Sequence, residues 1–172
     1  MSESFFLAVL PDPTTATRLA RRTAASCLKY NFSSRPISPE RFHISLLGFG
    51  DYDPKLAEAV TRIAGTIQAL PFEVRFDRAL SFKSAKKSPF VLTGEESLAK
   101  LREFAGQVSA AFGVKLSSFT PHLTLIWDDK RIEPHEIQPV GWIVREFTLI
   151  RSFVGKSRYE ILGRWPLESV RL

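Results

Sequence analysis

The order of apolar and polar residues predicts short strands that alternate with amphipathic helices. Residues 4–10 form a nearly continuous apolar run that ends at Pro11, which is typical of a buried strand. Asp12 and Pro13 then suit the N-cap and the first turn of a helix. The apolar stripe of this helix comprises Leu19, Thr23, Cys27 and Tyr30. A loop over residues 31–39 leads into the next apolar strand.

A second helix and a strand with one apolar face follow. Asp53 and Pro54 restart a helix. Its apolar side comprises Leu56, Val60, Ile63 and Ile67. Over residues 72–77, apolar residues alternate with charged ones, which predicts a strand that buries one face.

After a basic loop the same order of elements starts again. The lysines of this loop are Lys83, Lys86 and Lys87. Residues 89–93 predict a strand, and Gly94 opens a helix that Gly113 ends. The apolar side of this helix comprises Leu98, Leu101, Phe104 or Ala105, Val108 and Phe112. The remaining strand candidates are residues 121–126, 142–150 and 159–165.

Strand, helix, loop and strand therefore occur twice, which indicates an internal duplication with diverged sequence. We expect an α+β fold of two strand–helix–strand lobes, related by a pseudo-twofold axis, with antiparallel sheets flanking a central cleft. No linker rich in Pro, Gly or Ser separates the halves, so residues 1–172 are expected to form a single bilobal domain.

The most informative residues are two histidines at matching places in the two halves. They occur in the segments Phe-His-Ile-Ser-Leu and Pro-His-Leu-Thr-Leu. Successive side chains of a strand point to opposite faces, so His43 shares a face with Ser45, and His122 shares one with Thr124. Across a pseudo-twofold axis, both imidazoles and both hydroxyls would converge on the cleft.

Two imidazoles that face one small volume suit acid–base catalysis at a phosphodiester. A neutral histidine accepts a proton from the attacking water or hydroxyl, and a protonated one donates to the departing oxygen. Ser45 and Thr124 would hydrogen-bond the non-bridging oxygens, where charge accumulates in the transition state. This chemistry needs no metal or other cofactor, and a strained 2′,3′-cyclic phosphate is a well-suited substrate. The pattern does not distinguish the acid from the base.

Other residues bear on the alternatives. His135 lies in a polar, loop-like segment, and a site of three histidines would lack the close ligand spacing typical of zinc. Cys27 is the only cysteine, so zinc held by cysteines is excluded and the residue is interpreted as apolar filler. The 24 Lys and Arg outnumber the 18 Asp and Glu, and this net charge of +6 favours polyanionic partners. Neither a signal-peptide pattern nor an apolar segment of bilayer length is evident, so we expect a cytoplasmic protein.

The paired motifs resemble those of the two-histidine phosphoesterase superfamily, and specifically of the bacterial 2′-5′ RNA ligase-like family, whose members act as RNA 2′,3′-cyclic phosphodiesterases. The resemblance extends over nearly the whole chain, although only the two histidine motifs are specific. The supporting segments are residues 5–9, 42–50, 121–128, 146–149, 152–153, 158–159 and 164–167.

This resemblance implies an active site in the cleft and hydrolysis of a terminal 2′,3′-cyclic phosphate to a 2′-phosphate. It implies that His43 is the proton donor and that His122 activates water. Ser45 and Thr124 would hold the phosphate, and formation of a 2′-5′ bond between RNA ends would be the reverse of ring opening. We therefore expect RNA or oligonucleotide ends as partners, no metal, no membrane and a monomer.

Two positions depart from the family pattern. Ser45 replaces the usual threonine and keeps the hydroxyl, whereas Trp127 stands where many relatives carry a basic residue. Basic residues that would replace this contact are Arg151, Lys156 and Arg158. The further candidates for substrate binding are Arg158, Tyr159, Phe49 and Trp127. Trp127 and Phe49 would stack on a base, with ordinary packing as the alternative for each.

Two other functions use the same residues. The first is a phosphodiesterase for a small cyclic substrate, such as a nucleoside 2′,3′-cyclic phosphate or a cyclic ADP-ribose phosphate. The second is an RNA-binding module that uses the basic cleft without chemistry. The loop lysines would either lead an RNA tail along the surface or form a solvated loop.

Overall fold

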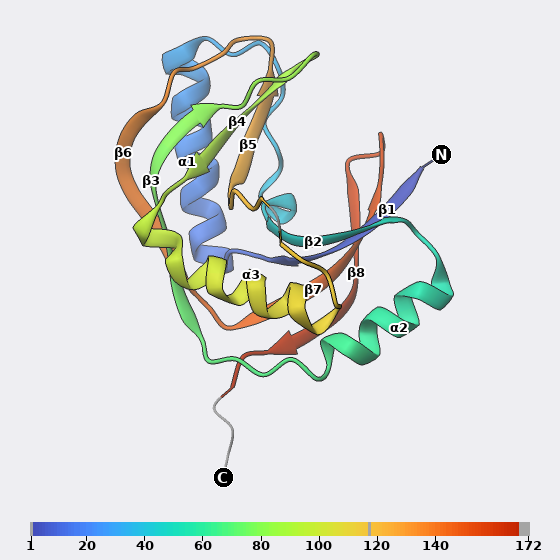
Figure 1. Cartoon of the computed structure of the whole chain (residues 1–172). Coiled ribbons are helices and arrows are strands. Elements are labelled where there is room, and N and C mark those ends of the chain that lie inside the picture. The colour runs from blue at the N-terminus through green and yellow to red at the C-terminus, as the bar shows by residue number, and fades with distance from the viewer. Residues whose placement is uncertain (1, 117, 169–172) are drawn as a thin grey trace.

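The computed structural model describes residues 2–116 and 118–168, in which two four-stranded sheets form. Sheet A has the strand order β2-β1-β7-β8, sheet B has the order β5-β4-β3-β6, and neighbouring strands are antiparallel (Figure 1). The strands of sheet A are β1 (Glu3–Val9), β2 (Ile44–Asp51), β7 (Glu146–Phe153) and β8 (Arg158–Pro166). The strands of sheet B are β3 (Phe72–Ser81), β4 (Ser88–Thr93), β5 (Leu123–Asp128) and β6 (His135–Val144).

Helices cover the outer faces of both sheets. They are α1 (Pro13–Tyr30), α2 (Pro54–Ala64) and α3 (Ala99–Ala111), with the short 3-10 helices η1 (Pro39–Arg41) before β2 and η2 (Glu96–Leu98) before α3. The predicted α+β class with two antiparallel sheets is therefore confirmed. Among the described residues, no helix is both long and apolar enough to cross a membrane.

Helices α1 and α3 each contact the sheet that they do not follow in the sequence. Helix α1 follows β1 of sheet A, yet it packs on β5 and β6 of sheet B (Figure 1). Helix α3 follows β4 of sheet B and reaches sheet A, where Phe104 contacts Phe147 of β7 and Phe112 contacts Phe49 of β2. Sheet B is therefore covered by a helix that follows a strand of sheet A, whereas α3 packs across both sheets and contacts β3 as well as β2 and β7.

The helix starts form as the sequence predicts. The Asp12 carboxylate accepts hydrogen bonds from the backbone N–H and the hydroxyl of Thr15, both at 2.8 Å. The Asp53 carboxylate accepts the backbone N–H groups of Lys55 and Leu56. Each cap satisfies donors that the first helical turn leaves free. Gly113 ends α3 with a positive φ of 66°, a conformation that glycine adopts without steric cost.

The predicted apolar side of the second helix is partly wrong. Leu56 is 42% exposed, whereas the neighbouring Ala57 is buried. The buried face of α2 comprises Ala57, Val60 and Ala64. A short helix at the edge of the fold can turn its small residues toward the core and leave a leucine in solvent, because its own packing area is small.

Two strands occupy residues 142–150, for which the sequence predicts one strand. Strand β6 ends at Val144 in sheet B, and β7 begins at Glu146 in sheet A. The chain passes from sheet B to sheet A at residue 145. The apolar pattern continues across this point because β6 and β7 both contribute buried side chains to the core. The segment around His135, predicted as a loop, supplies the start of β6, where His135 pairs with Ala79.

The two sheets carry the same irregularity at the same place, which supports the predicted duplication. In sheet A, β2 pairs Ile44 with Val9 and Ser45 with Ala8, and then skips Leu46. In sheet B, β5 pairs Leu123 with Leu92 and Thr124 with Val91, and then skips Leu125. Each bulge follows directly after the hydroxyl residue of the motif. A bulge bends its strand and re-aims the side chains beyond it.

Buried apolar side chains from both sheets form one cluster. Cys27 is half-buried and packs against this cluster, in keeping with its interpretation as filler, and burial raises the pKa of its thiol.

Candidate active site

His43 and His122 hold equivalent positions, each directly before the first residue of an edge strand, β2 and β5. The Nδ1 of His43 lies 2.9 Å from the carbonyl oxygen of Arg41, and the Nδ1 of His122 lies 2.8 Å from that of Thr120. A carbonyl oxygen only accepts, so each Nδ1 carries a hydrogen and donates it. In the neutral imidazole the lone pair is therefore on Nε2.

His135 makes the same local contact but is engaged on both nitrogens. Its Nδ1 lies 2.9 Å from the carbonyl oxygen of Glu133, and its Nε2 lies 3.0 Å from the hydroxyl of Tyr30. Tyr30 belongs to α1, so His135 joins the helix to β6. This histidine is a packing residue of sheet B, and its Nε2 is occupied by the tyrosine hydroxyl.

Two observations bring the histidine motifs together. The backbone N–H of Ile37, in the loop before η1, donates to the carbonyl oxygen of Leu125 in β5 at 2.9 Å. The chain that leads to His43 thus runs along the strand that His122 opens. In addition, the charge of His122 is one cause of the lowered pKa of His43, which places the two imidazoles within electrostatic reach of each other.

The environment of His43 favours its neutral form. Burial lowers the pKa of His43 most, and the charges of His122 and Arg41 lower it further. The hydrogen bond to the Arg41 carbonyl opposes them and raises the pKa. The ring is packed between Phe6, with ring centroids 5.0 Å apart, and Tyr159, with centroids 5.4 Å apart.

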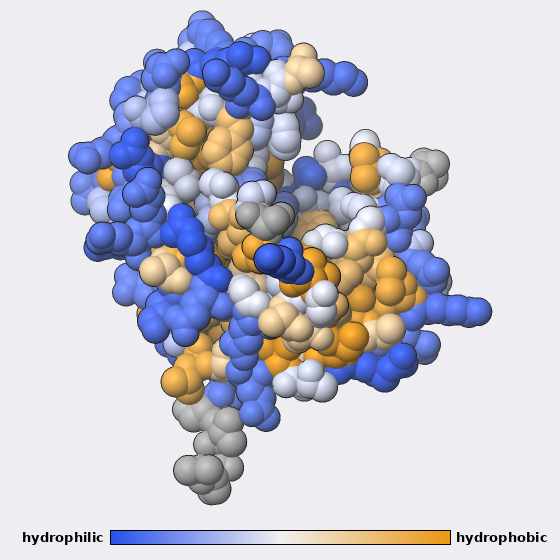
Figure 2. Space-filling view, viewed as in Figure 1, coloured by the Kyte–Doolittle hydropathy of each residue, from blue (hydrophilic) through white to orange (hydrophobic). Residues whose placement is uncertain are grey.

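On the other side of the site, Phe82 lies edge-on to His122, with ring centroids 5.0 Å apart. Phe82 is the first residue of the basic loop after β3. The aromatic contact of His122 therefore comes from a loop, whereas the aromatic contacts of His43 come from strands β1 and β8. Figure 2 shows that the surface is hollowed between the two sheets.

The two hydroxyl residues share the accessible face of their strands with the histidines. Ser45 is exposed and Thr124 is half-buried. Among residues 2–116 and 118–168, neither hydroxyl has a hydrogen-bond partner. Both are therefore available to an oxyanion placed between the strands.

The structure places the other predicted residues on different faces. Tyr159 reaches His43, whereas Phe49 packs on Phe5 and Phe112 on the helix-covered face of sheet A. Arg158 neighbours Tyr159 in the chain, but its guanidinium lies over the ring of Phe153, 4.9 Å from the centroid. Trp127 is 47% exposed in β5.

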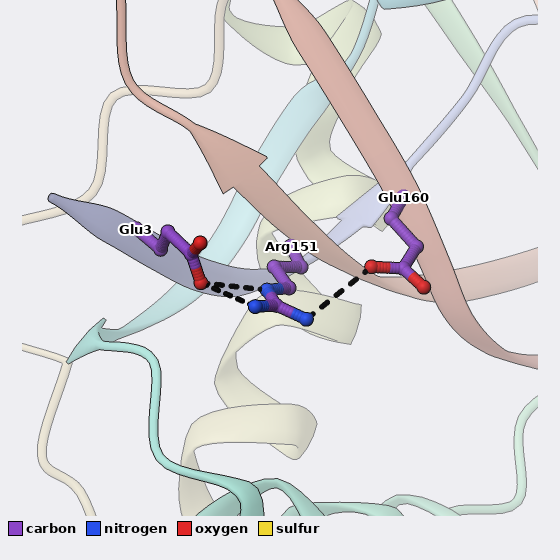
Figure 3. A network of polar contacts seen from close by, with 3 residues as sticks. All are labelled: Glu3, Arg151 and Glu160. Carbon is purple, nitrogen blue, oxygen red and sulfur yellow. Dashed lines mark hydrogen bonds and ion pairs between the residues drawn. The ribbon is translucent and has the colours of Figure 1, made fainter. Parts of the chain in front are cut away.

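Arg151 is committed to structural contacts. Its guanidinium binds the carboxylates of Glu3 and Glu160, and thereby ties β7 to both neighbouring strands (Figure 3). Arg151 pairs with Phe5 and not with Phe6, so its side chain lies on the face of sheet A opposite to His43. Lys156 is an exposed residue of the turn between β7 and β8.

Sequence reasoning missed Arg41. Its guanidinium lies over the Tyr159 ring, 4.8 Å from the centroid, and its Nε is buried with no hydrogen-bond partner among the described residues. The residue lies two positions before His43 but belongs to the 3-10 helix η1, so strand alternation gave no signal for it. In the described part of the chain, no group of three His, Cys, Asp or Glu residues could hold a metal ion.

The protein is thus of the class that combines a two-lobed α+β fold with a histidine directly before an edge strand of each sheet. Residues 11–152, which include both motifs, match the 2′-5′ RNA ligase superfamily. The chain belongs to this family.

Individual relatives agree with this assignment. The chain is 29% identical over 147 residues to the RNA 2′,3′-cyclic phosphodiesterase of Escherichia coli strain K12, covering 78% of this chain and 81% of that protein. It is similar in fold to E. coli LigT complexed with phosphate, with a TM-score of 0.73, 22% identity and coverage of 98% and 99% of the two chains. It is also similar to the Thermus thermophilus protein TT0787, with a TM-score of 0.74, 19% identity and coverage of 98% and 100%.

Proposed function

We propose that the protein is an RNA 2′,3′-cyclic phosphodiesterase, which opens a terminal 2′,3′-cyclic phosphate to a 2′-phosphate. The observation that carries this proposal is the matched pair His43 and His122, each fixed through Nδ1 so that Nε2 is left for proton transfer. Membership in the 2′-5′ RNA ligase superfamily and the name of the 29% identical relative support the same reaction.

In the proposed reaction, Nε2 of His122 accepts a proton from water as the water oxygen bonds to phosphorus. The bond from phosphorus to the 3′ oxygen breaks, and that oxygen takes a proton from Nε2 of protonated His43. Ser45 and Thr124 donate hydrogen bonds to the non-bridging oxygens, and the charge of Arg41 lies beside His43. Attack by a 5′-hydroxyl of RNA on a cyclic end, through the same groups, would form a 2′-5′ bond.

The lowered pKa of His43 bears on this assignment. It favours the neutral ring in the free enzyme, while a bound phosphodiester anion offsets the nearby positive charges and favours the protonated ring. A cyclic substrate with sulfur at the 3′ bridging position needs little acid assistance. This substrate should therefore restore the rate of His43→Ala more than that of His122→Ala, and the opposite result would exchange the roles.

The test of the function is turnover of an oligonucleotide that ends in a 2′,3′-cyclic phosphate, with the product identified by ³¹P NMR. His43→Ala and His122→Ala should each lose about 10²–10⁴-fold in rate. His135→Gln is the matched control, because His135 makes the same backbone contact outside the site. Full turnover in either active-site variant would refute the proposal.

The same assay separates the alternative functions. A small cyclic nucleotide as the true substrate would be turned over faster than the oligonucleotide. An RNA-binding module would bind RNA without a cyclic end in a salt-sensitive manner and release no product. We further propose that the enzyme acts as a cytoplasmic monomer with one bilobal domain, and that EDTA leaves its activity unchanged.

A further inference from the structure

Trp127 lies on the same face of sheet B as the catalytic motif. Thr124 pairs with Val91, and after the bulge Ile126 pairs with Phe90, whose ring contacts Tyr30 of α1. The bulge therefore turns Ile126 toward the helix and returns Trp127 to the side of Thr124. In sheet A, the position that corresponds to Trp127 is Gly48. The aromatic ring is thus specific to one half of the duplicated fold.

Trp127 forms one wall of an open groove with the loop between β3 and β4. The groove has a volume of about 960 Å³ and is lined by Ser84, Ala85, Lys86, Lys87, Trp127 and Asp129. Two ammonium groups and one carboxylate give it a net positive charge. An exposed ring beside lysines matches the two parts of a nucleotide, a base that stacks and a phosphate that is anionic.

Contacts outside the groove hold its loop in place. The Arg131 guanidinium donates to the carbonyl oxygen of Ser84 at 2.9 Å and to the hydroxyl of Ser88 at 3.2 Å. The ammonium group of Lys87 donates to the hydroxyl of Ser34 at 2.8 Å. The groove is therefore a formed surface, which lowers the entropic cost of binding a flexible strand.

The loop and the strand that form the groove also adjoin the second histidine motif. The loop that forms it begins at Phe82, whose ring contacts His122. Because the bulge leaves Leu125 unpaired, Thr124 and Trp127 pair with Val91 and Pro89, which are two positions apart. Trp127 therefore lies about 7 Å further along β5 than Thr124. A strand of RNA whose terminal phosphate lies at Thr124 would thus meet Trp127 with a nucleotide upstream of the terminal one.

We propose that this groove binds single-stranded RNA one or two nucleotides upstream of the cyclic end, with a base stacked on Trp127 and a backbone phosphate beside Lys86 and Lys87. This inference rests on the proposed function and narrows it to oligonucleotide ends, as opposed to free cyclic nucleotides.

The experiment compares kcat/KM for a trinucleotide and for a nucleoside, each ending in a 2′,3′-cyclic phosphate. Trp127→Ala should lower kcat/KM for the trinucleotide about tenfold and leave the nucleoside value unchanged. Trp127→Phe should retain most of the trinucleotide value, since a phenyl ring still stacks. Lys86→Gln should reduce the trinucleotide value and its salt dependence. Lys55→Gln, at the start of α2, is the matched control and should change neither.

Equal effects of Trp127→Ala on both substrates, or no effect on either, would overturn the inference. A binding measurement tests it without turnover. A trinucleotide with a 3′-phosphate should quench the fluorescence of Trp127 and bind Trp127→Ala about tenfold more weakly. Unchanged affinity of Trp127→Ala would likewise overturn it. If the unmodified enzyme binds this RNA through Trp127 but opens no cyclic phosphate, the proposed function fails while the groove assignment stands.

Discussion

The phenol ring of Tyr159 lies edge-on against the imidazole of His43, with centroids 5.4 Å apart and an interplanar angle of 70°. The phenol also contacts the ring of Phe6 and the guanidinium of Arg41. Tyr159 thus shields the imidazole from water on one side and keeps a cation close to it. Burial, the main cause of the lowered pKa of His43, therefore depends on this ring.

Replacement of Tyr159 by leucine should raise the pKa of His43 toward the ordinary imidazole value, because the smaller side chain admits water to the ring. The measurement is an NMR titration of the His43 imidazole resonances. Tyr159→Phe is the matched control and should leave the pKa close to that of the unmodified protein. A pKa that does not move in Tyr159→Leu would show that other residues desolvate His43.

The pH dependence of kcat/KM should be bell-shaped, because one imidazole must be charged and the other neutral. Its acidic limb should lie below the ordinary histidine pKa, since burial and the nearby charges lower the pKa of His43. The two limbs belong to the coupled pair and not to single residues. A single rising limb in the unmodified enzyme would contradict the paired roles.

Asp128 should contribute to stability in a pH-dependent manner. Burial raises its pKa, but hydrogen bonds from the backbone N–H groups of Lys130, Ser34 and Ser33 prevail and lower it to about 2, from 3.8. Because the folded state holds the carboxylate ionised, this contribution is complete above pH about 4 and is lost as the pH falls toward 2.

This pKa shift means that the ionised Asp128 carboxylate contributes about 2 kcal/mol to the free energy of unfolding at neutral pH. Asp128→Asn should therefore lower the free energy of unfolding at pH 7 and flatten its loss in acid, as measured by urea denaturation at several pH values. Asp129→Asn removes the same charge from an exposed neighbour and should have little effect. Equal losses for both variants would argue against the backbone contacts as the cause.

Gly141 should not tolerate a side chain. A Cβ atom there would lie 2.2 Å from the carbonyl oxygen of Val74 in the neighbouring strand. Gly141→Ala should destabilise the protein by about 2–3 kcal/mol, because backbone atoms cannot give way as a flexible side chain would. Gly48→Ala is the control, since no atom lies within 4 Å of its Cβ position. Thermal unfolding of the two variants measures the difference.

The sequence predicted the repeated elements and both histidine motifs well, because strand alternation and helix caps are local signals. Asp12 and Asp53 cap their helices as expected, since the cap depends on residues within one turn. The packing of α1 on sheet B and of α3 across both sheets carries no such local signal. It depends on which apolar faces meet in three dimensions.

The rest of the site could not be predicted for a related reason. Phe49 and Trp127 both lie beyond a bulge, and strand parity does not show which face such residues take. Arg151 was a candidate to replace the basic contact that is missing at Trp127, yet its pairing with Glu3 and Glu160 depends on long-range strand register. Arg41 was not predicted because it belongs to a 3-10 helix, where the alternation of strand faces does not apply.

The strand orders show how the two halves of the chain share the two sheets. A cut within the loop over residues 82–87 would leave β1, β2 and β3 in one fragment and the remaining strands in the other. Sheet A and sheet B would then each contain strands from both fragments, so neither fragment would hold all the strands of a sheet. The two strands of each repeated unit pair with each other, β1 with β2 and β4 with β5, but each sheet also needs strands from the other half of the chain. The two halves therefore depend on each other for folding.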